Sequence, residues 1–194
     1  MLIESGYSLE TVFREVRDQL KRANSDKKHH FRFFSVATSG LAGQPVQSRI
    51  VVLRSFSDEW EFEFYTDHRS SKVEQIKNNP MLSALFWDPS KQVQVRMEAR
   101  AVIHHEDDHA NDHWMRVQGD ARKAYTSLVV PGNTISAPEE AHQWPEELYD
   151  DHFSVIRCES VKILILQISG LEHLAYSFQK NRQTGNWQGS RTAP

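Results

Sequence analysis

Hydrophobic residues recur along this chain with two different periods, and the period separates helices from strands. After Ser8, which suits an N-cap, apolar residues follow at helical spacing over residues 9–23 and predict an amphipathic helix. A second, short helix is predicted over 71–78, which ends before an Asn-Pro pair. Residues 60–66 alternate strictly between apolar and polar, which is the pattern of a strand with one buried face.

Most of the remaining chain is predicted to form strands. Further apolar or alternating segments cover residues 31–38, 46–54, 81–87, 92–103, 153–158, 161–168 and 174–179. Tight turns separate several of them, including the pairs Ser57-Asp58 and Ser169-Gly170, and a tail begins at Trp187. Roughly seven or eight short strands joined by tight turns predict a mainly β (α+β) fold, an antiparallel and nearly closed barrel with peripheral helices.

Residues 106–150 differ in composition from the strands on either side. Residues 106–128 are polar with a helical pattern, and a loop-rich stretch from Pro131 to Pro145 follows them. Because this stretch contains little that would form a core, we expect a helical and loop insertion within a single domain that spans residues 1–194.

Composition and charge exclude several classes of partner. The 194 residues are 39% hydrophobic, which suffices for a core, and carry a formal charge of -3. Without a basic excess we expect no contact with nucleic acid, and without a long apolar run we expect no membrane span. The single cysteine, Cys158, excludes an internal disulfide, and the first residues lack the features of an export signal. We therefore expect a cytoplasmic protein.

Positive side chains at two places point to a phosphate-bearing ligand. Arg49 and Arg54 flank a hydrophobic strand, where a guanidinium requires an anionic partner. Ser71 and Lys72 open the predicted helix 71–78, whose free N–H groups and dipole also favour phosphate. Because Arg49 and Arg54 are five residues apart, a regular strand would point them to opposite faces, so we expect them to have separate roles.

Five segments in order resemble the pyridoxamine 5'-phosphate oxidase family. They are Arg49–Arg54, Phe64–Thr66, Ser71-Lys72, Gln94–Glu98 and Trp187–Pro194. The resemblance implies a split β-barrel that binds flavin mononucleotide (FMN) at the interface of a homodimer and passes hydride to or from a small-molecule substrate. The cofactor-binding residues that it implies are Arg49, Ile50, Val51, Val52, Tyr65, Thr66, Ser71, Lys72, Gln94, Trp187 and Arg191.

Within that resemblance, individual residues receive different roles. Arg49 and Lys72 would neutralise the FMN phosphate, Gln94 would hydrogen-bond the flavin, and Arg54 would face the substrate. Each has a plainer alternative: surface cations at Arg49 and Arg54, an ordinary N-cap at 70–72, an exposed Gln94, and a Trp187 that anchors the tail to the core.

Departures from the family pattern bear on the reaction. The true oxidase carries Arg-X-His-X-Arg where this chain has Leu171–Ala175, so only His173 matches, and Ser71 stands where arginine is common. The sequence therefore favours an FMN-dependent oxidoreductase other than the true oxidase, with Arg54 and His173 as substrate-side candidates. Two alternatives remain: a genuine pyridoxamine 5'-phosphate oxidase that uses other cations, and a non-catalytic flavin- or haem-binding protein.

A histidine-rich segment raises the question of a metal. His105, His109 and His113 share one face if the segment is a continuous helix, with Asp108 and Asp112 nearby. The outer two would lie about 12 Å apart, so at most two neighbours can share an ion. We therefore expect no physiological metal site. The same segment supplies the axial ligands that the haem alternative requires.

Overall fold

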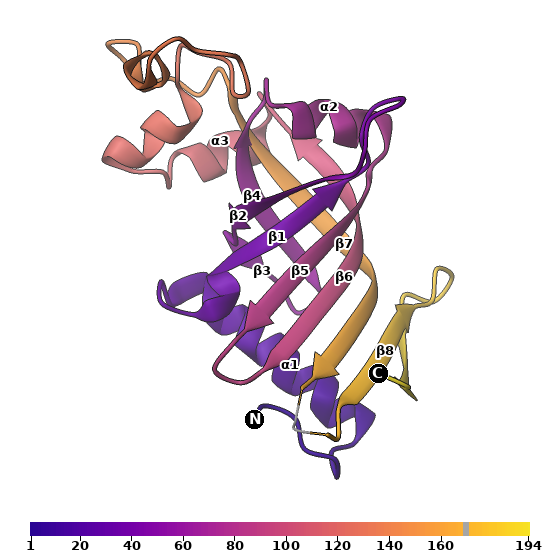
Figure 1. Cartoon of the computed structure of the whole chain (residues 1–194). Coiled ribbons are helices and arrows are strands. Elements are labelled where there is room, and N and C mark those ends of the chain that lie inside the picture. The colour runs from indigo at the N-terminus through magenta and orange to yellow at the C-terminus, as the bar shows by residue number, and fades with distance from the viewer. Residues whose placement is uncertain (169–170) are drawn as a thin grey trace.

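The computed structural model describes residues 1–168 and 171–194, and these form a single antiparallel sheet with helices around it (Figure 1). The strands are β1 (Phe33–Thr38), β2 (Gln47–Val52), β3 (Ser55–Phe56), β4 (Glu61–Asp67), β5 (Met81–Asp88), β6 (Val93–His104), β7 (Phe153–Gln167), β8 (Leu174–Lys180) and β9 (Trp187–Thr192). The helices are α1 (Leu9–Ser25), α2 (Ser71–Asn78) and α3 (Asp108–Trp114), with 3-10 turns at His30–Arg32, Gly119–Tyr125 and Pro138–His142.

The order of the strands makes the sheet a barrel. It runs β2-β1-β5-β6-β7-β4-β3, while β8 pairs with β7 and β9 pairs with β8. Strand β2 pairs with β1, but just after β2 ends the chain crosses to β4. There the Arg54 N–H donates to the Glu63 carbonyl at 2.9 Å and Ser55 of β3 pairs with Glu63. The two ends of the strand order are therefore joined by one continuous segment. The predicted antiparallel barrel with peripheral helices is confirmed.

The longest strand, β7, was expected as two strands and is one. It pairs with β6 along its length, with β4 through its first half and with β8 through its second half. The β6–β7 register shifts between Glu98 and Ala99, opposite Val161. A bulge of this kind bends a strand without ending it, so β7 passes from one partner to the next.

The C-terminal segment, interpreted from the sequence as a tail, forms strand β9 against β8. Trp187 lies beside Phe13 and Trp60, with ring centroids 5.5 and 6.2 Å apart, so it anchors this strand to the core. Gly189 lies over Phe178, where an added Cβ would meet the ring at 2.5 Å. The turn predicted at Ser169-Gly170 lies outside the described residues.

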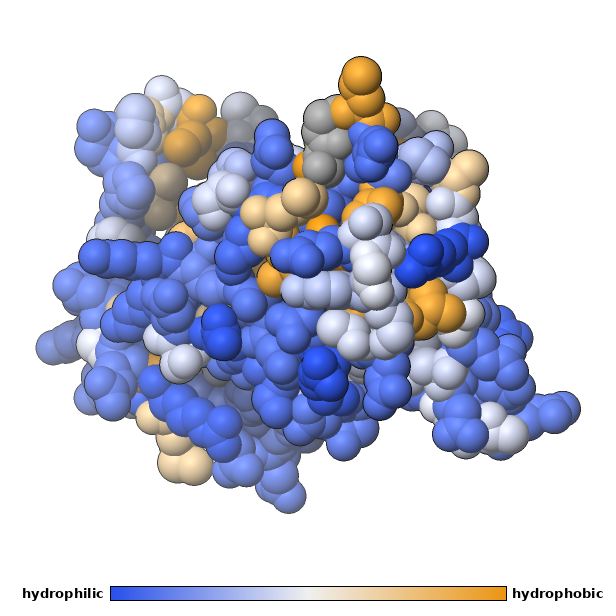
Figure 2. Space-filling model, turned by 90° about the horizontal axis from the view of Figure 1, so that it is seen from below, coloured by the Kyte–Doolittle hydropathy of each residue, from blue (hydrophilic) through white to orange (hydrophobic). Residues whose placement is uncertain are grey.

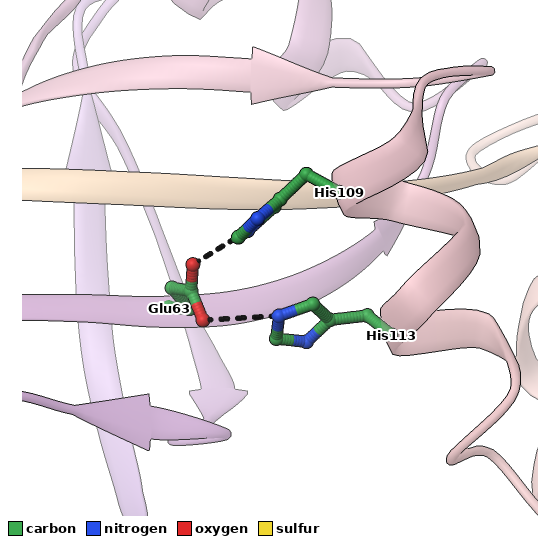
Figure 3. A group of neighbouring side chains, drawn as sticks. All are labelled: Glu63, His109 and His113. Carbon is green, nitrogen blue, oxygen red and sulfur yellow. Dashed lines mark hydrogen bonds and ion pairs between the residues drawn. The ribbon is translucent and has the colours of Figure 1, made fainter.

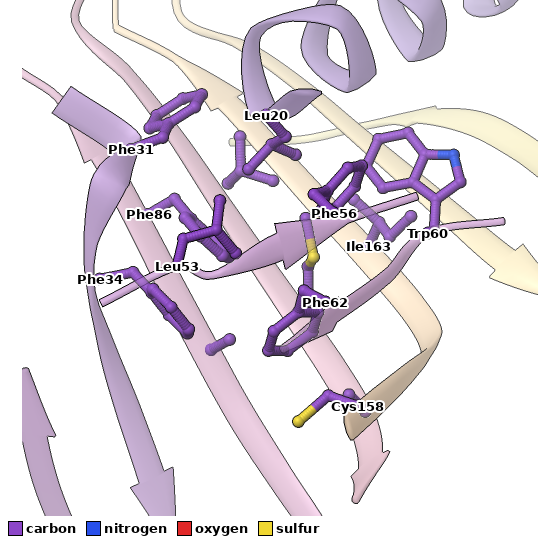
Figure 4. Close-up of a cluster of buried hydrophobic side chains, with 14 of the residues drawn as sticks. Leu20, Phe31, Phe34, Leu53, Phe56, Trp60, Phe62, Phe86, Cys158 and Ile163 are labelled. Atoms are coloured by element: carbon purple, nitrogen blue, oxygen red, sulfur yellow. The ribbon is translucent and has the colours of Figure 1, made fainter. Parts of the chain in front are cut away.

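Aromatic side chains fill the barrel, and α1 covers it (Figure 4). Ser8 caps α1 as predicted, accepting from the Thr11 N–H at 3.1 Å. Phe34 and Phe86 stack with centroids 4.4 Å apart. Cys158 is fully buried in this core, and burial raises the pKa of its thiol, so the thiol is inert as expected.

A second layer lies on the outer side of β4 and β7, near the α2 end of the barrel (Figure 1). The pattern over 60–66 predicted one buried face, yet Glu63 is only 7% exposed because α3 covers it. The helical pattern over 106–128 is realised as α3 and the 3-10 turn Gly119–Tyr125, separated by irregular backbone. Glu106 has φ of 53° before α3 begins, and α3 ends at Trp114. His105 therefore lies outside the helix and stacks on His68 instead.

The surface is mostly polar where it can be followed around α1. Figure 2 shows the end of the molecule away from α2, where hydrophilic residues dominate and the hydrophobic ones gather on one side. None of the described helices is both long and apolar enough to cross a membrane.

Stability should depend on pH through His29, which caps the turn before β1. Its Nδ1 accepts from the Phe31 N–H at 3.1 Å, and burial, followed by the charge of Lys91, lowers its pKa from 6.5. Below 6.5 the unfolded chain binds more protons at this site, so the free energy of unfolding falls as the pH falls. In denaturant titrations the variant His29→Asn, which keeps an acceptor, should lose less stability on acidification than the wild type. A profile as steep as that of the control His142→Asn would contradict the assignment.

Candidate active site

A cavity of about 310 Å³ runs along β2, between that strand, the end of β4 and the segment after α3. Its lining includes Arg49, Ile50, Val51, Val52, Arg54, Tyr65, Thr66, Ser70, Lys72, Tyr125 and Pro131. The cavity opens beside the start of α2, where Ser71 and Gly132 join Arg49 and Lys72. Residues predicted from three separate segments therefore meet in one place.

Arg49 and Lys72 form a pair of cations at one end of this cavity. Arg49 donates to Thr38 Oγ1 at 2.5 Å and to Gln75 Oε1 at 3.1 Å, and Lys72 Nζ donates to Thr66 Oγ1 at 2.9 Å. In the described part of the chain neither cation has a carboxylate partner, because neighbouring Asp67 pairs with Arg69.

The charges of this pair are poorly compensated. Burial lowers the pKa of Lys72, and the charge of Arg49 lowers it further against a smaller opposing effect of Asp67, while burial also lowers the pKa of Arg49. Two half-buried cations with only neutral partners favour an anion between them.

The start of α2 adds further donors to the same end. Ser70 occupies the N-cap position, but its hydroxyl donates to the Asp67 carbonyl at 2.7 Å and makes no side-chain cap to the helix. The first N–H groups of α2 are therefore without the side-chain oxygen that an ordinary N-cap supplies. Together with the helix dipole they suit a phosphate group.

Arg54 lies at the other end of the cavity. Its Nη2 donates to the Tyr125 hydroxyl at 3.2 Å and its guanidinium carbon lies 4.9 Å from the centre of the Tyr65 ring. Because β2 ends at Val52, the alternation of a regular strand does not reach Arg54, and both arginines border the same cavity. The prediction that Arg49 and Arg54 point to opposite faces of the sheet is therefore wrong. The two arginines instead lie at opposite ends of one cavity.

A second cavity of about 370 Å³ continues from Arg54 and Tyr65. It brings in Arg32 and Arg116, which the sequence analysis missed, together with His113. No local pattern marked the two arginines, since one lies in the 3-10 turn before β1 and the other in a segment interpreted as solvated. Tyr125 was missed for the same reason. The geometry thus offers one cationic end for a phosphate and a second cationic end for another anion.

Four predicted site residues lie away from these cavities in the single chain. Gln94 is on the outer face of β6, paired across the sheet with Trp87. Trp187 packs on Phe13 as the plainer alternative proposed, and Arg191 donates to the Ser5 and Tyr7 carbonyls at 3.2 and 3.0 Å. His173 is exposed just before β8. Their cofactor or substrate roles remain predictions.

Comparisons with known proteins show what the first half of the chain is similar to. Residues 13–105 match the family model described as pyridoxamine 5'-phosphate oxidase, FMN-binding domain. A pyridoxine/pyridoxamine 5'-phosphate oxidase from Trichormus variabilis is 32% identical over 88 residues, which are 45% of this chain and 40% of the relative. One from Shewanella woodyi is 44% identical over 70 residues, 35% of this chain and 32% of the relative. These alignments thus span well under half of the curated relatives.

Solved structures share the fold over nearly the whole chain. A pyridoxamine 5'-phosphate oxidase-related, FMN-binding protein from Nostoc punctiforme superposes with a TM-score of 0.77 at 22% identity, covering 94% of this chain and 97% of the other. PhzG from Burkholderia lata, in complex with tetrahydrophenazine-1-carboxylic acid, gives 0.75 at 15% identity, covering 94% and 92%.

Fold and site together define an FMN-binding protein of the split-barrel class. Residues 13–105, just under half of the chain, match the pyridoxamine 5'-phosphate oxidase, FMN-binding domain, and FMN is the cofactor that this description names. The residues present fit the phosphate of that cofactor, because Arg49, Lys72 and the uncapped start of α2 form a cationic pocket without a carboxylate partner in the described chain.

The poorly compensated cations give a prediction about stability. Replacing Lys72 with Met removes one charge and keeps much of the apolar side-chain volume, so the FMN-free protein should gain about 1 kcal/mol in free energy of unfolding. Urea titration of the apoprotein measures the change. Lys77→Met, on the exposed side of the same helix, is the control and should bring no gain. A destabilised Lys72→Met apoprotein would show that Lys72 is already compensated.

Proposed function

We propose that this protein is an FMN-dependent oxidoreductase that acts on a small anionic substrate and works as a homodimer. The observation that carries the proposal is the Arg49–Lys72 pair at the start of α2, beside a cavity along β2. Among the described residues its side-chain hydrogen-bond partners are neutral. When bound, FMN supplies the hydride acceptor or donor. The side chains of this chain would bind, orient and enclose the reacting molecules.

Each end of the cavity has its own task in this proposal. Arg49 and Lys72 bind the cofactor phosphate with help from Thr66 and Ser71, and the Ile50–Val52 backbone forms the wall along the ring system. Tyr65 keeps its phenolic proton, because burial raises its pKa, and so remains a hydrogen-bond donor beside Arg54.

The substrate end favours an anion. Arg32, Arg54 and Arg116 line the second cavity, and none of them forms an ion pair in the described part of the chain. Guanidinium groups bind carboxylate and phosphate with paired hydrogen bonds. The ligand named for PhzG carries a carboxylate, which is consistent with this class of substrate.

A genuine pyridoxamine 5'-phosphate oxidase is the second candidate. The Arg-X-His-X-Arg run is missing, yet these three arginines could hold a substrate phosphate instead. Formation of pyridoxal 5'-phosphate from the pyridoxine and pyridoxamine phosphates, measured by absorbance, decides between the two candidates.

An apolar face on the sheet supports the homodimer. Phe33, Ile50, Leu85 and Trp87 are 58%, 66%, 37% and 40% exposed on neighbouring strands β1, β2 and β5. Solvent exposure of four large apolar side chains at one place is unfavourable, and a second copy would cover them. In the proposed dimer, Gln94, Trp187 and Arg191 act on the cofactor held by the other protomer.

FMN binding tests the phosphate assignment. Arg49→Ala and Lys72→Ala should each weaken binding about tenfold to a hundredfold, because each removes a charge-assisted contact to the phosphate. Arg54→Ala and Lys77→Ala should have smaller effects. Fluorescence quenching of FMN on titration with apoprotein measures the affinity. Equal losses in all four variants, or a protein that binds haem and no FMN, would reject the proposal.

Oligomeric state tests the apolar face. Phe33→Asp places a charge within this face and should convert a dimer to monomers with weakened FMN binding, as followed by sedimentation velocity. Leu128→Asp is the control, because Leu128 is similarly exposed, at 57%, in the segment after α3. A wild-type monomer, or a Phe33→Asp dimer, would contradict the proposed interface.

A further inference from the structure

Three side chains outside the proposed flavin site converge on one point (Figure 3). Glu63 on β4 faces two histidines of α3, with His109 Nε2 2.8 Å from Oε1 and His113 Nε2 3.4 Å from Oε2. The three ligand atoms all lie within 4.8 Å of one another. A tetrahedral ion with bonds of about 2.1 Å holds its ligand atoms about 3.4 Å apart, so the longer separations must shorten and the 2.8 Å one must lengthen for the ion to fit.

The carboxylate in this cluster is buried without a permanent cation. Glu63 is 7% exposed, and the two imidazoles are its only ion-pair partners among the described residues. A buried carboxylate is costly unless a positive charge compensates it. A divalent cation bound between Glu63 and the two imidazoles would supply that charge.

The surrounding groups orient the imidazoles as they do in metal sites. His113 Nδ1 lies 2.9 Å from the Tyr65 hydroxyl. When Nδ1–H donates to the Tyr65 oxygen, the Nε2 lone pair faces Glu63 and the Tyr65 proton stays available to a ligand in the cavity. His104 Nδ1 lies 2.9 Å from Asp107 Oδ2, and the ring centroids of His104 and His109 are 4.3 Å apart. A carboxylate that accepts the Nδ1–H leaves the lone pair on Nε2.

The lone pair on His104 Nε2 is an independent indication that a ligand binds here. His104 Nε2 is buried and has no hydrogen-bond partner among the described residues. Buried polar atoms of this kind require an explanation, and a nearby cation is one. The i, i+4 pair His109 and His113 with a carboxylate from a strand is also a donor set that zinc accepts.

We propose that Glu63, His109 and His113 bind a divalent transition metal, zinc foremost. His104, whose ring lies beside that of His109 but outside the 4.8 Å cluster, would move in to give its Nε2 as the fourth ligand. Nitrogen donors combined with one carboxylate favour zinc over the oxygen-seeking magnesium and calcium. The ion would fasten α3 to β4 beside the cavity that His113 helps to line. The proposal does not depend on FMN, and it replaces the expectation of no metal, which considered the helix spacing without Glu63.

Zinc binding to the full-length protein tests the proposal. Protein stripped with a chelator and dialysed against zinc should retain one ion per chain, measured by mass spectrometry of the metal. Competition with a chromophoric chelator gives the affinity, which should fall at least about tenfold in His109→Ala, His113→Ala and Glu63→Gln. His104→Ala should also weaken binding. His142→Ala, which changes an exposed histidine remote from the cluster in sequence, should retain the wild-type affinity.

Thermal unfolding and circular dichroism guard against loss of the fold. His109 is 34% exposed in its side chain, so His109→Ala should remain folded, and zinc should raise the melting temperature of the wild type but not of this variant. X-ray absorption should show only nitrogen and oxygen ligands at the ion. A wild type that retains no zinc, or a folded His109→Ala that binds it as well as the wild type, would overturn the proposal. Unchanged affinity in His104→Ala would overturn the fourth ligand.

Discussion

The crossing from β2 to β3 is the constraint on which the rest of the structure depends. Strand β2 pairs with β1 up to Val52, and two residues later the Arg54 N–H bonds to the Glu63 carbonyl on β4. This short segment therefore joins β2 and β3, the two strands at the ends of the sheet order, and so closes the barrel. It fixes Arg49 next to α2 while it brings Arg54 beside Tyr65, so barrel closure and the division of the cavity into two cationic ends have one cause.

Much of the fold could be predicted from the sequence because its hydrophobic periods are local. The alternation in β5 and β6 and the capped helix α1 appear with nearly the expected bounds, since each pattern is decided by neighbours along the chain. The errors fall where distant segments decide. Trp187 turned a predicted tail into β9 by packing on Phe13, and α3 buried Glu63 on a face that the alternation marked as solvated.

The residues of the site also divide into those that a local pattern could predict and those that depend on distant segments. Arg49, Thr66 and Lys72 were identified through their order along the chain and do meet at one cavity. Arg32 and Arg116 could not be identified, because nothing near either of them in sequence indicates a cavity that forms only when the 3-10 turn before β1 and the segment after α3 come together. Gln94 was named from the resemblance alone, and its place on the outer face of β6 ties its proposed role to a second copy of the chain.

The long strand β7 has a consequence for how the chain is made on the ribosome. Its residues 153–167 complete the ladders of both β4 and β6, which are synthesised far earlier. Until these residues leave the exit tunnel, two strand edges remain open to pairing with other nascent chains. Native closure must therefore wait until most of the polypeptide has been translated, and this interval is when the protein most needs protection by chaperones.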